Sequence, residues 1–292
     1  MSFGSFTQKR LRVTLIMSGA NSVFPGTNSN TLTLENMRVS ARVQGVARLA
    51  TQADIRIYGM RADDMNALTV AWANPPVVLD HLVILEADNG KGYVQVFKGT
   101  ITEAQPDYAA QPNVSFALLA VTGYFQKINP APPRSFPAAS DIDTIAAGIV
   151  ADMGGDWTFT NGGAFGTLSE GAYFWGTLWD QLAMACAATN TDFYVFGDNV
   201  LITEGGRPNA ELPSVILTPQ SGLIGYPSYE RSGLAVSALY DPAFACGTPL
   251  DIESSVPAAT GRWYPYSLTH FLESRTPRGQ WMTQMQCLRV LA

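Results

Sequence analysis

Apolar and polar residues alternate along most of the first 125 residues. In the stretch 10–17, RLRVTLIM, every second side chain is apolar. A strand points successive side chains to opposite faces of its sheet, so this alternation predicts a strand with one buried face. We expect a β-barrel or β-sandwich over residues 10–125, interrupted by one helical turn at 63–68. The same pattern, with a change of phase at 35–36, predicts strands at 32–43, 53–57, 77–86, 93–98 and 114–124.

The middle of the chain has helical spacing instead. The segment 129–134, NPAPPR, contains three prolines, which cannot donate ladder hydrogen bonds, so we expect a domain boundary there. Isoleucines then recur at intervals of three and four residues, which predicts a helix at 142–153 with Ser140 and Asp143 in a capping box. A second helix is expected at about 174–189, followed by a short hairpin with strands at 193–196 and 200–203.

The β pattern returns after residue 215, and it predicts strands at 215–218, 234–240 and 250–254 and a hairpin at 268–287. The fold class is therefore mainly β with a small α+β module. We expect three parts: a first β domain at 1–128, a small α/β module at 135–211 and a second β domain at 212–292.

The amino-acid composition argues against several classes of protein. Charged residues make up only 14% of the chain and the net charge is −6, which argues against tight binding to phosphate backbones. Three cysteines far apart in sequence indicate buried thiols in a reducing compartment and not a disulfide framework. The N-terminus lacks an export signal and no apolar run approaches the about 20 residues of a membrane span, so membrane insertion is not expected.

The hairpin at 268–287 carries polar residues that could suggest an active site. Its turn is expected at 277–279, and alternation places His270 on the same face as the apolar residues, with Glu273 on the opposite face. The two side chains therefore cannot form a general-base or metal-binding pair, and we interpret His270 as a buried, hydrogen-bonded residue. Cys287 could lie across the hairpin from His270 as a nucleophile, although a core position is the better interpretation.

Other candidate chemistry is equally weak. Two histidines, His81 and His270, and three separated cysteines give no zinc-type spacing. The glycine-rich segment 162–166 lacks the Lys-Ser/Thr of a phosphate-binding loop and is interpreted as a hairpin turn. We predict no catalytic, cofactor-binding or metal residues. The carboxylates that could pair in a glycosidase site, with nothing to single them out, are Glu170, Asp180, Glu204 and Glu211.

Several short motifs distributed over nearly the whole chain suggest a family. The sequence resembles the baseplate hub proteins of contractile-tailed bacteriophages and related tail systems. The N-terminal part of the resemblance lies in 34–43 and in IRIYGM at 55–60. The C-terminal part lies in LIGYP at 223–227, LYDP at 239–242, GRW at 261–263, LTHFLES at 268–274 and PRGQW at 277–281.

The resemblance implies a non-enzymatic homotrimer in which each subunit contributes two tube-type antiparallel β-barrels, with strands exchanged between barrels in some hubs. Three copies would join a hexameric tail tube to a trimeric spike and line the DNA channel, with an acidic lumen that repels passing DNA. Implied partners are tail tube or distal tube proteins, the spike and other baseplate proteins. The expected location is the virion, after assembly in the host cytoplasm. Alternatives are a tail-associated cell-wall hydrolase, or a carbohydrate-binding adhesin module.

Overall fold

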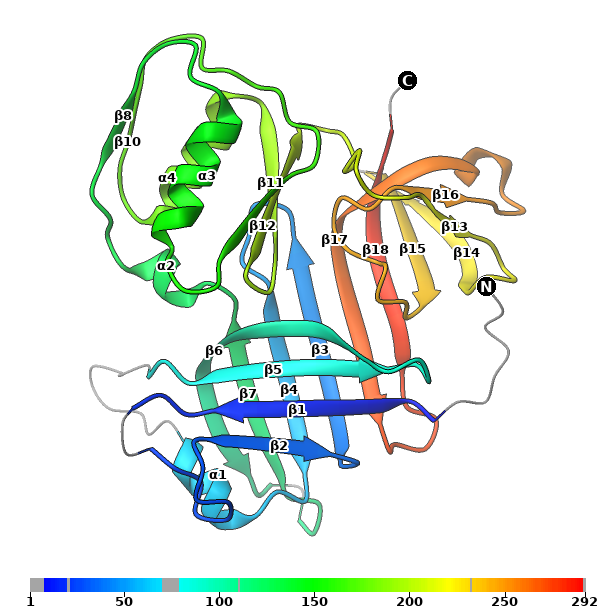
Figure 1. The fold of residues 1–292 in the computed structure, drawn as a ribbon. Helices are drawn as coiled ribbons and strands as arrows, with labels where there is room; N and C mark the ends of the chain where they lie inside the picture. Colours follow the sequence, from blue (N-terminus) through cyan, green and yellow to red (C-terminus); the bar gives the residue numbers. More distant parts are fainter. Residues whose placement is uncertain (1–7, 20–21, 70–78, 110, 232, 291–292) are drawn as a thin grey trace.

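The computed structural model describes residues 8–19, 22–69, 79–109, 111–231 and 233–290. Most of the described strands join one 13-stranded sheet, and the remainder form a three-stranded and a two-stranded sheet. Figure 1 shows three regions: the first half (residues 10–121), the helical module (124–211) and the second half (215–289). No described helix is long and apolar enough to span a membrane.

The first half has two layers of strands around one core. In Figure 1, β1, β2 and β5 cross in front of β3, β4 and β7, and β6 belongs to both layers because it pairs with β5 and then with β7. Inward-facing residues such as Val13, Ile55 and Phe116 form the core between the layers. The element bounds are β1 (Arg10–Ile16), β2 (Thr31–Glu35), β3 (Arg38–Val46), β4 (Gln52–Tyr58), α1 (Ala62–Leu68), β5 (Leu82–Asp88), β6 (Tyr93–Asp107) and β7 (Ser115–Val121).

The helical module packs two helices against a three-stranded sheet. Ile145 of one helix and Leu182 of the other contact a core that includes Phe193. An ion pair from Arg48 to Asp192, 2.7 Å long, links the module to the first half. The bounds are α2 (Tyr124–Ile128), β8 (Arg134–Phe136), α3 (Ile142–Asp152), β9 (Thr158–Asn161), β10 (Ala172–Phe174), α4 (Leu178–Ala188), β11 (Thr191–Phe196) and β12 (Asn199–Glu204).

The second half continues the large sheet of the first. β17 pairs with β3 in antiparallel register from Ser267 opposite Val46 to Ser274 opposite Val39, so the two halves share one sheet. The core of the second half also takes in Tyr194, which comes from the helical module. The bounds are β13 (Val215–Leu217), β14 (Leu223–Glu230), β15 (Gly233–Leu239), β16 (Leu250–Ile252), a 3₁₀ turn (Pro257–Ala259), β17 (Gly261–Ser274) and β18 (Trp281–Arg289).

The predicted fold class is confirmed in its coarser form, because the chain is mainly β with a small helical part. Two closed barrels are not confirmed. The large sheet runs from β14 to β2 along one open path, with β13 and β16 attached beside β17. The pairs β9–β12 and β13–β16 are parallel. The predicted domain boundaries stay a prediction.

Four local predictions differ from the structure. The N-cap of α3 is Asp141 without a side-chain capping bond, because the Ser140 hydroxyl donates to the Pro137 carbonyl instead; the capping box is at α4, between Thr177 and Asp180. The second predicted helix, α4, begins at Leu178 and not at about 174, because Phe174 ends the strand β10, which pairs with β8, and Thr177 is the N-cap. The segment 162–166 is not a hairpin turn, because the strands on either side of it pair elsewhere, β9 with β12 and β10 with β8. The strand predicted at 77–86 begins at Leu82, and its first two positions lie outside the described residues.

Candidate functional site

The structure separates His270 and Glu273 across the sheet, as the alternation predicts. The His270 ring is buried, with Nδ1 2.8 Å from the Thr283 hydroxyl, and it packs edge-on against Tyr240. Burial lowers the pKa of His270 to about 4, so the ring is neutral at pH 7. On the other face, Glu273 accepts hydrogen bonds from the Ser40 hydroxyl and the Gln280 backbone NH. This pair therefore cannot act on one substrate.

Cys287 is not the cross-strand neighbour of His270. In the β17–β18 register, His270 lies opposite Thr283 and Cys287 lies opposite Pro265. All three cysteines are free and buried, and burial raises the pKa of the Cys186 thiol to about 11. A buried neutral thiol without a histidine partner is not an activated nucleophile.

The carboxylates considered for a glycosidase have ordinary structural surroundings. Asp180 accepts from the Thr177 backbone NH and hydroxyl in the capping box, and Glu204 forms an exposed ion pair with Arg207. Glu170 and Glu211 lie exposed between strands. His81 is buried and its Nδ1 accepts from the Ser18 backbone NH. Within the described residues, no cluster of three His, Cys, Asp or Glu could hold a metal ion.

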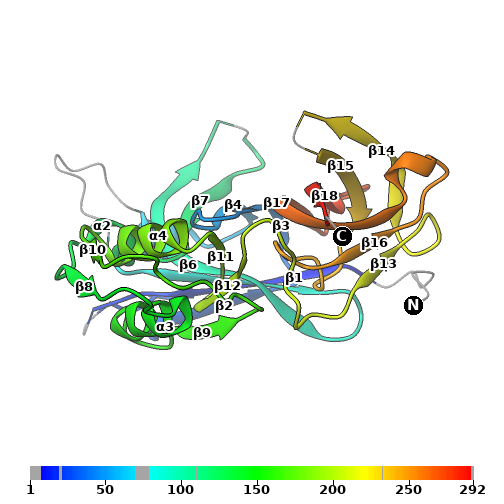
Figure 2. The ribbon, with the colours of Figure 1, turned by 90° about the horizontal axis from the view of Figure 1, so that it is seen from above.

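The large sheet curves, and its outer face lies on the side away from β1, β2 and β5; we call it the concave face. Seen from above in Figure 2, the β6–β7 and β14–β15 hairpins rise on either side of β4, β3, β17 and β18. Uncharged polar side chains face outward across the centre of this trough. The registers place one row side by side on five successive strands, and its members are Ser237, Gln284, Thr269, Gln44 and Gln52.

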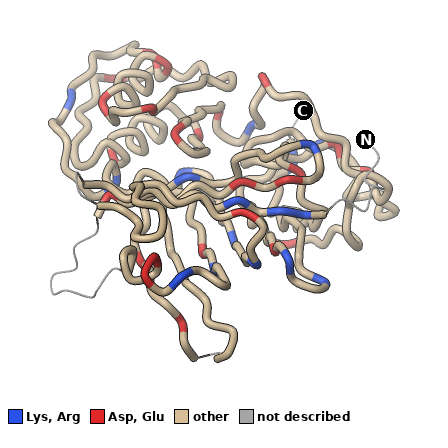
Figure 3. The backbone as a smooth tube through the Cα atoms, turned by 60° about the horizontal axis from the view of Figure 1, so that its bottom comes forward, with Lys and Arg blue, Asp and Glu red and all other residues tan. Residues whose placement is uncertain are grey.

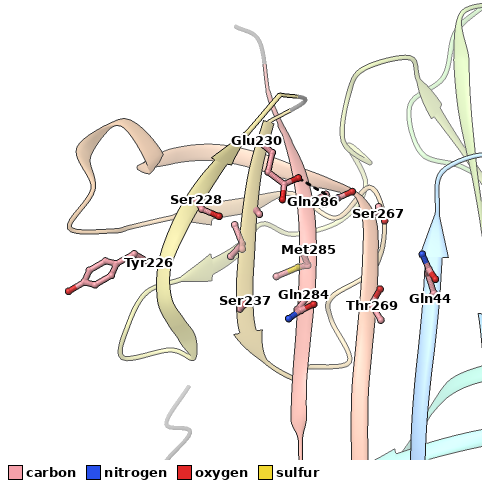
Figure 4. Close-up of a pocket in the computed structure, with 12 residues that line it drawn as sticks. Gln44, Tyr226, Ser228, Glu230, Ser237, Ser267, Thr269, Gln284, Met285 and Gln286 are labelled. Atoms are coloured by element: carbon pink, nitrogen blue, oxygen red, sulfur yellow. Dashed lines mark hydrogen bonds between the residues drawn. The ribbon is translucent and has the colours of Figure 1, made fainter. Parts of the chain in front are cut away.

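A shallow pocket of about 380 Å³ lies on this face between β14 and β3 (Figure 4). Glu230 is the one charged residue in its lining, and its carboxylate accepts from the Gln286 side-chain amide at 3.2 Å. Hydroxyl and amide groups dominate the remainder of the lining. We missed this surface in the sequence because its members come from distant strands; the polar half of each alternating pattern was its only signal.

The first-half end of the concave face is charged but balanced. Arg38 and Arg42 point outward from β3 and Arg56 from β4, while Asp54, Glu273 and Asp107 supply three carboxylates nearby. The negative charge of the chain is concentrated elsewhere. The helical module contains ten Asp and Glu against three Lys and Arg, a net charge of −7, and the other 204 residues carry +1 (Figure 3).

The chain matches the family model described as Baseplate hub gp41 over residues 10–285. Its fold is similar to that of a tail protein from Neisseria meningitidis MC58, with TM-score 0.61, 9% identity and coverage of 95% of this chain and 96% of that one. A 43 kDa tail protein of prophage MuSo2 from Shewanella oneidensis gives the same TM-score, identity and coverage. A third similar structure is a type VI secretion component from E. coli, described as structurally similar to T4 tail proteins gp27 and gp5. Its TM-score is 0.59 at 9% identity, and the match covers 95% of this chain and 77% of that one. No curated protein matches.

Proposed function

The chain belongs to the Baseplate hub gp41 family, and we propose that three copies of it form a ring that joins the tail tube to the spike and surrounds the DNA channel. In this ring the concave sheet face lines the channel. The row of Ser237, Gln284, Thr269, Gln44 and Gln52 is the observation that carries the proposal.

The chemistry of that face suits a passage for DNA. Binding to DNA depends on Lys and Arg that neutralise phosphates, and the central row has none. Hydroxyl and amide groups keep the surface hydrated without holding a polyanion. The wall of the proposed channel thus carries no charge along its central row, and at the first-half end its positive and negative charges are equal in number. In this proposal a neutral channel wall replaces the acidic lumen that the resemblance implied.

Free strand edges flank the same face. One free edge is β14, which is the last strand of the path. The other is on β6: its residues 93–100 pair with β5, but the same edge of residues 102–107 has no strand neighbour among the described residues. Unpaired edges are templates for another chain, and a head-to-tail contact closes into a ring when the rotation allows. Pairing between copies would complete the tube wall, which retains two tube-type barrels as part of the proposal.

The remaining parts of the proposal concern activity and assembly. The subunit is non-enzymatic, is assembled in the host cytoplasm and resides in the virion, with tube, spike and other baseplate proteins as neighbours. Support comes from the family description and from the separated polar residues of the hairpin. No observation favours a cell-wall hydrolase or a carbohydrate-binding adhesin.

Mass in solution tests the ring. The purified full chain, alone and co-expressed with its neighbouring tail proteins, should give a species of three times 31.4 kDa by light scattering and a ring by negative-stain microscopy. A monomer under both conditions would overturn the trimer. Hydrolysis of purified peptidoglycan that is lost in Glu204→Gln would instead establish an enzyme.

A further inference from the structure

A second pocket lies at the end of the first half, away from the polar row. It has a volume of about 490 Å³ and lies between the start of β3, the end of β4, α1 and the β6–β7 turn. This volume falls within the range of about 300 to 1,000 Å³ that is typical of ligand sites. We call it the terminal groove.

Apolar side chains dominate the terminal groove. Met60 and Met65 line it and are buried in the first-half core, while Tyr108 is 49% exposed. The other apolar or aromatic residues of the lining are Tyr58, Ala62, Pro112 and Val114. Methionine is flexible and polarizable, so a floor of two methionines can adapt to an inserted side chain. The groove therefore suits one large apolar side chain.

Arg38 supplies a positive charge at this groove. Its guanidinium carbon lies 4.3 Å from the centre of the Tyr58 ring, which orients the group. Arg38 has no carboxylate within 4 Å among the described residues, whereas six other arginines do. A stacked guanidinium keeps its in-plane donors available, and a carboxylate can accept two of them at once.

We propose that the terminal groove binds a segment of a partner tail protein in which a large apolar side chain stands next to a carboxylate. The apolar side chain enters between Tyr58 and Tyr108 and contacts Met60 and Met65. The carboxylate accepts from Arg38. The charge of Arg38 favours this partner over one that has no carboxylate. All groove residues belong to one copy, so the inference is independent of the ring.

Methyl NMR on the full chain tests the proposal with defined probes. The chain carries ¹³C-methyl methionine, and the probes are acetyl-Ala-Leu-Phe-Asp-amide and the same peptide with Asn in place of Asp. The Asp peptide should shift the Met60 and Met65 methyl signals and leave Met153 and Met285, which lie in other cores, unchanged. The Asn peptide should bind about tenfold more weakly, because it lacks the charge.

Two variants and one matched control locate the binding. Arg38→Ala should weaken the Asp peptide about tenfold and remove its preference over the Asn peptide. Ala62→Trp, at an exposed lining position, should block both peptides. The control is Arg42→Ala, because Arg42 shares the strand and face of Arg38, stacks on Phe271 and lies outside the groove. Equal binding of the two peptides, equal loss in Arg42→Ala, or no methyl shift at millimolar peptide would overturn the proposal.

Discussion

The two β halves contribute neighbouring strands to the same concave face, but they bury that face's reverse side differently. The first half covers it with β1, β2 and β5, whereas the described part of the second half supplies the short strands β13 and β16 and takes in Tyr194 of the helical module. The first-half core in turn takes in three residues of the second half, Tyr240, Leu272 and Trp281. The second half therefore depends on the first through aromatic and hydrogen-bonding contacts. We call these contacts the seam, and its residues are Tyr240, His270, Leu272, Ser274 and Trp281.

Trp281 should be the largest single contributor to the seam. Its ring is buried, packs edge-on against Tyr240 at 5.7 Å, and its Nε1 donates to Asn89 in the β5–β6 turn at 2.7 Å. We expect Trp281→Ala to lower the free energy of unfolding by about 3 to 5 kcal/mol. Urea unfolding followed by circular dichroism measures this. Trp175→Ala, at a ring that is 59% exposed, is the control and should change stability by less than about 0.5 kcal/mol. If the two substitutions lowered the free energy of unfolding equally, Trp281 would not stabilise the contact between the two halves.

His270 should make the seam sensitive to acid. Its pKa is about 4 in the folded chain against 6.5 for an unperturbed histidine, because burial disfavours the charged ring. Between these values the unfolded chain binds a proton that the folded chain does not. Stability is therefore fully present above pH 6.5 and falls by about 3 kcal/mol as the pH drops to 4.

Unfolding free energies measured from pH 7.5 to 4 check this dependence. His270→Leu should be less stable at pH 7.5, because it leaves the Thr283 hydroxyl without its partner. Its stability should nevertheless fall less steeply with pH, since one proton-binding group is gone. A slope identical to that of the parent chain would show that His270 does not titrate in this way.

Ser274 should have the smallest of the three effects. Its hydroxyl donates to the Met37 carbonyl at 2.8 Å and fixes the end of β17 to the turn before β3. We expect Ser274→Ala to cost about 1 kcal/mol, the net value of a buried hydrogen bond. Ser237→Ala on the concave face is the matched control, because its hydroxyl is half-buried and faces outward. The same urea unfolding measurement distinguishes the two, and an effect of Ser237→Ala as large as that of Ser274→Ala would contradict the assignment.

Local pattern predicted many of the strands and the two longest helices, α3 and α4, but it missed β8, β9, β10 and β14 and could not predict which strands pair. Alternation located β1 and β4 and separated His270 from Glu273, because side-chain direction follows from the strand alone. The pairing of Thr269 with Gln44 depends on residues 225 positions apart, and the sequence pattern does not encode a partner strand. The predicted capping box failed for a local reason, because the Ser140 hydroxyl donates to the Pro137 carbonyl three residues earlier. The concave face and the terminal groove therefore emerge only when distant strands are placed together.

The concentration of acid in the helical module makes each subunit an electric dipole. With −7 on the module and +1 on the remainder, two copies repel one another least when the module of one faces the β halves of the other, so charge favours that orientation. The repulsion between modules extends about 10 Å at 0.1 M salt and shortens to about 3 Å at 1 M. Salt should consequently ease the encounter of subunits and weaken this preference of orientation.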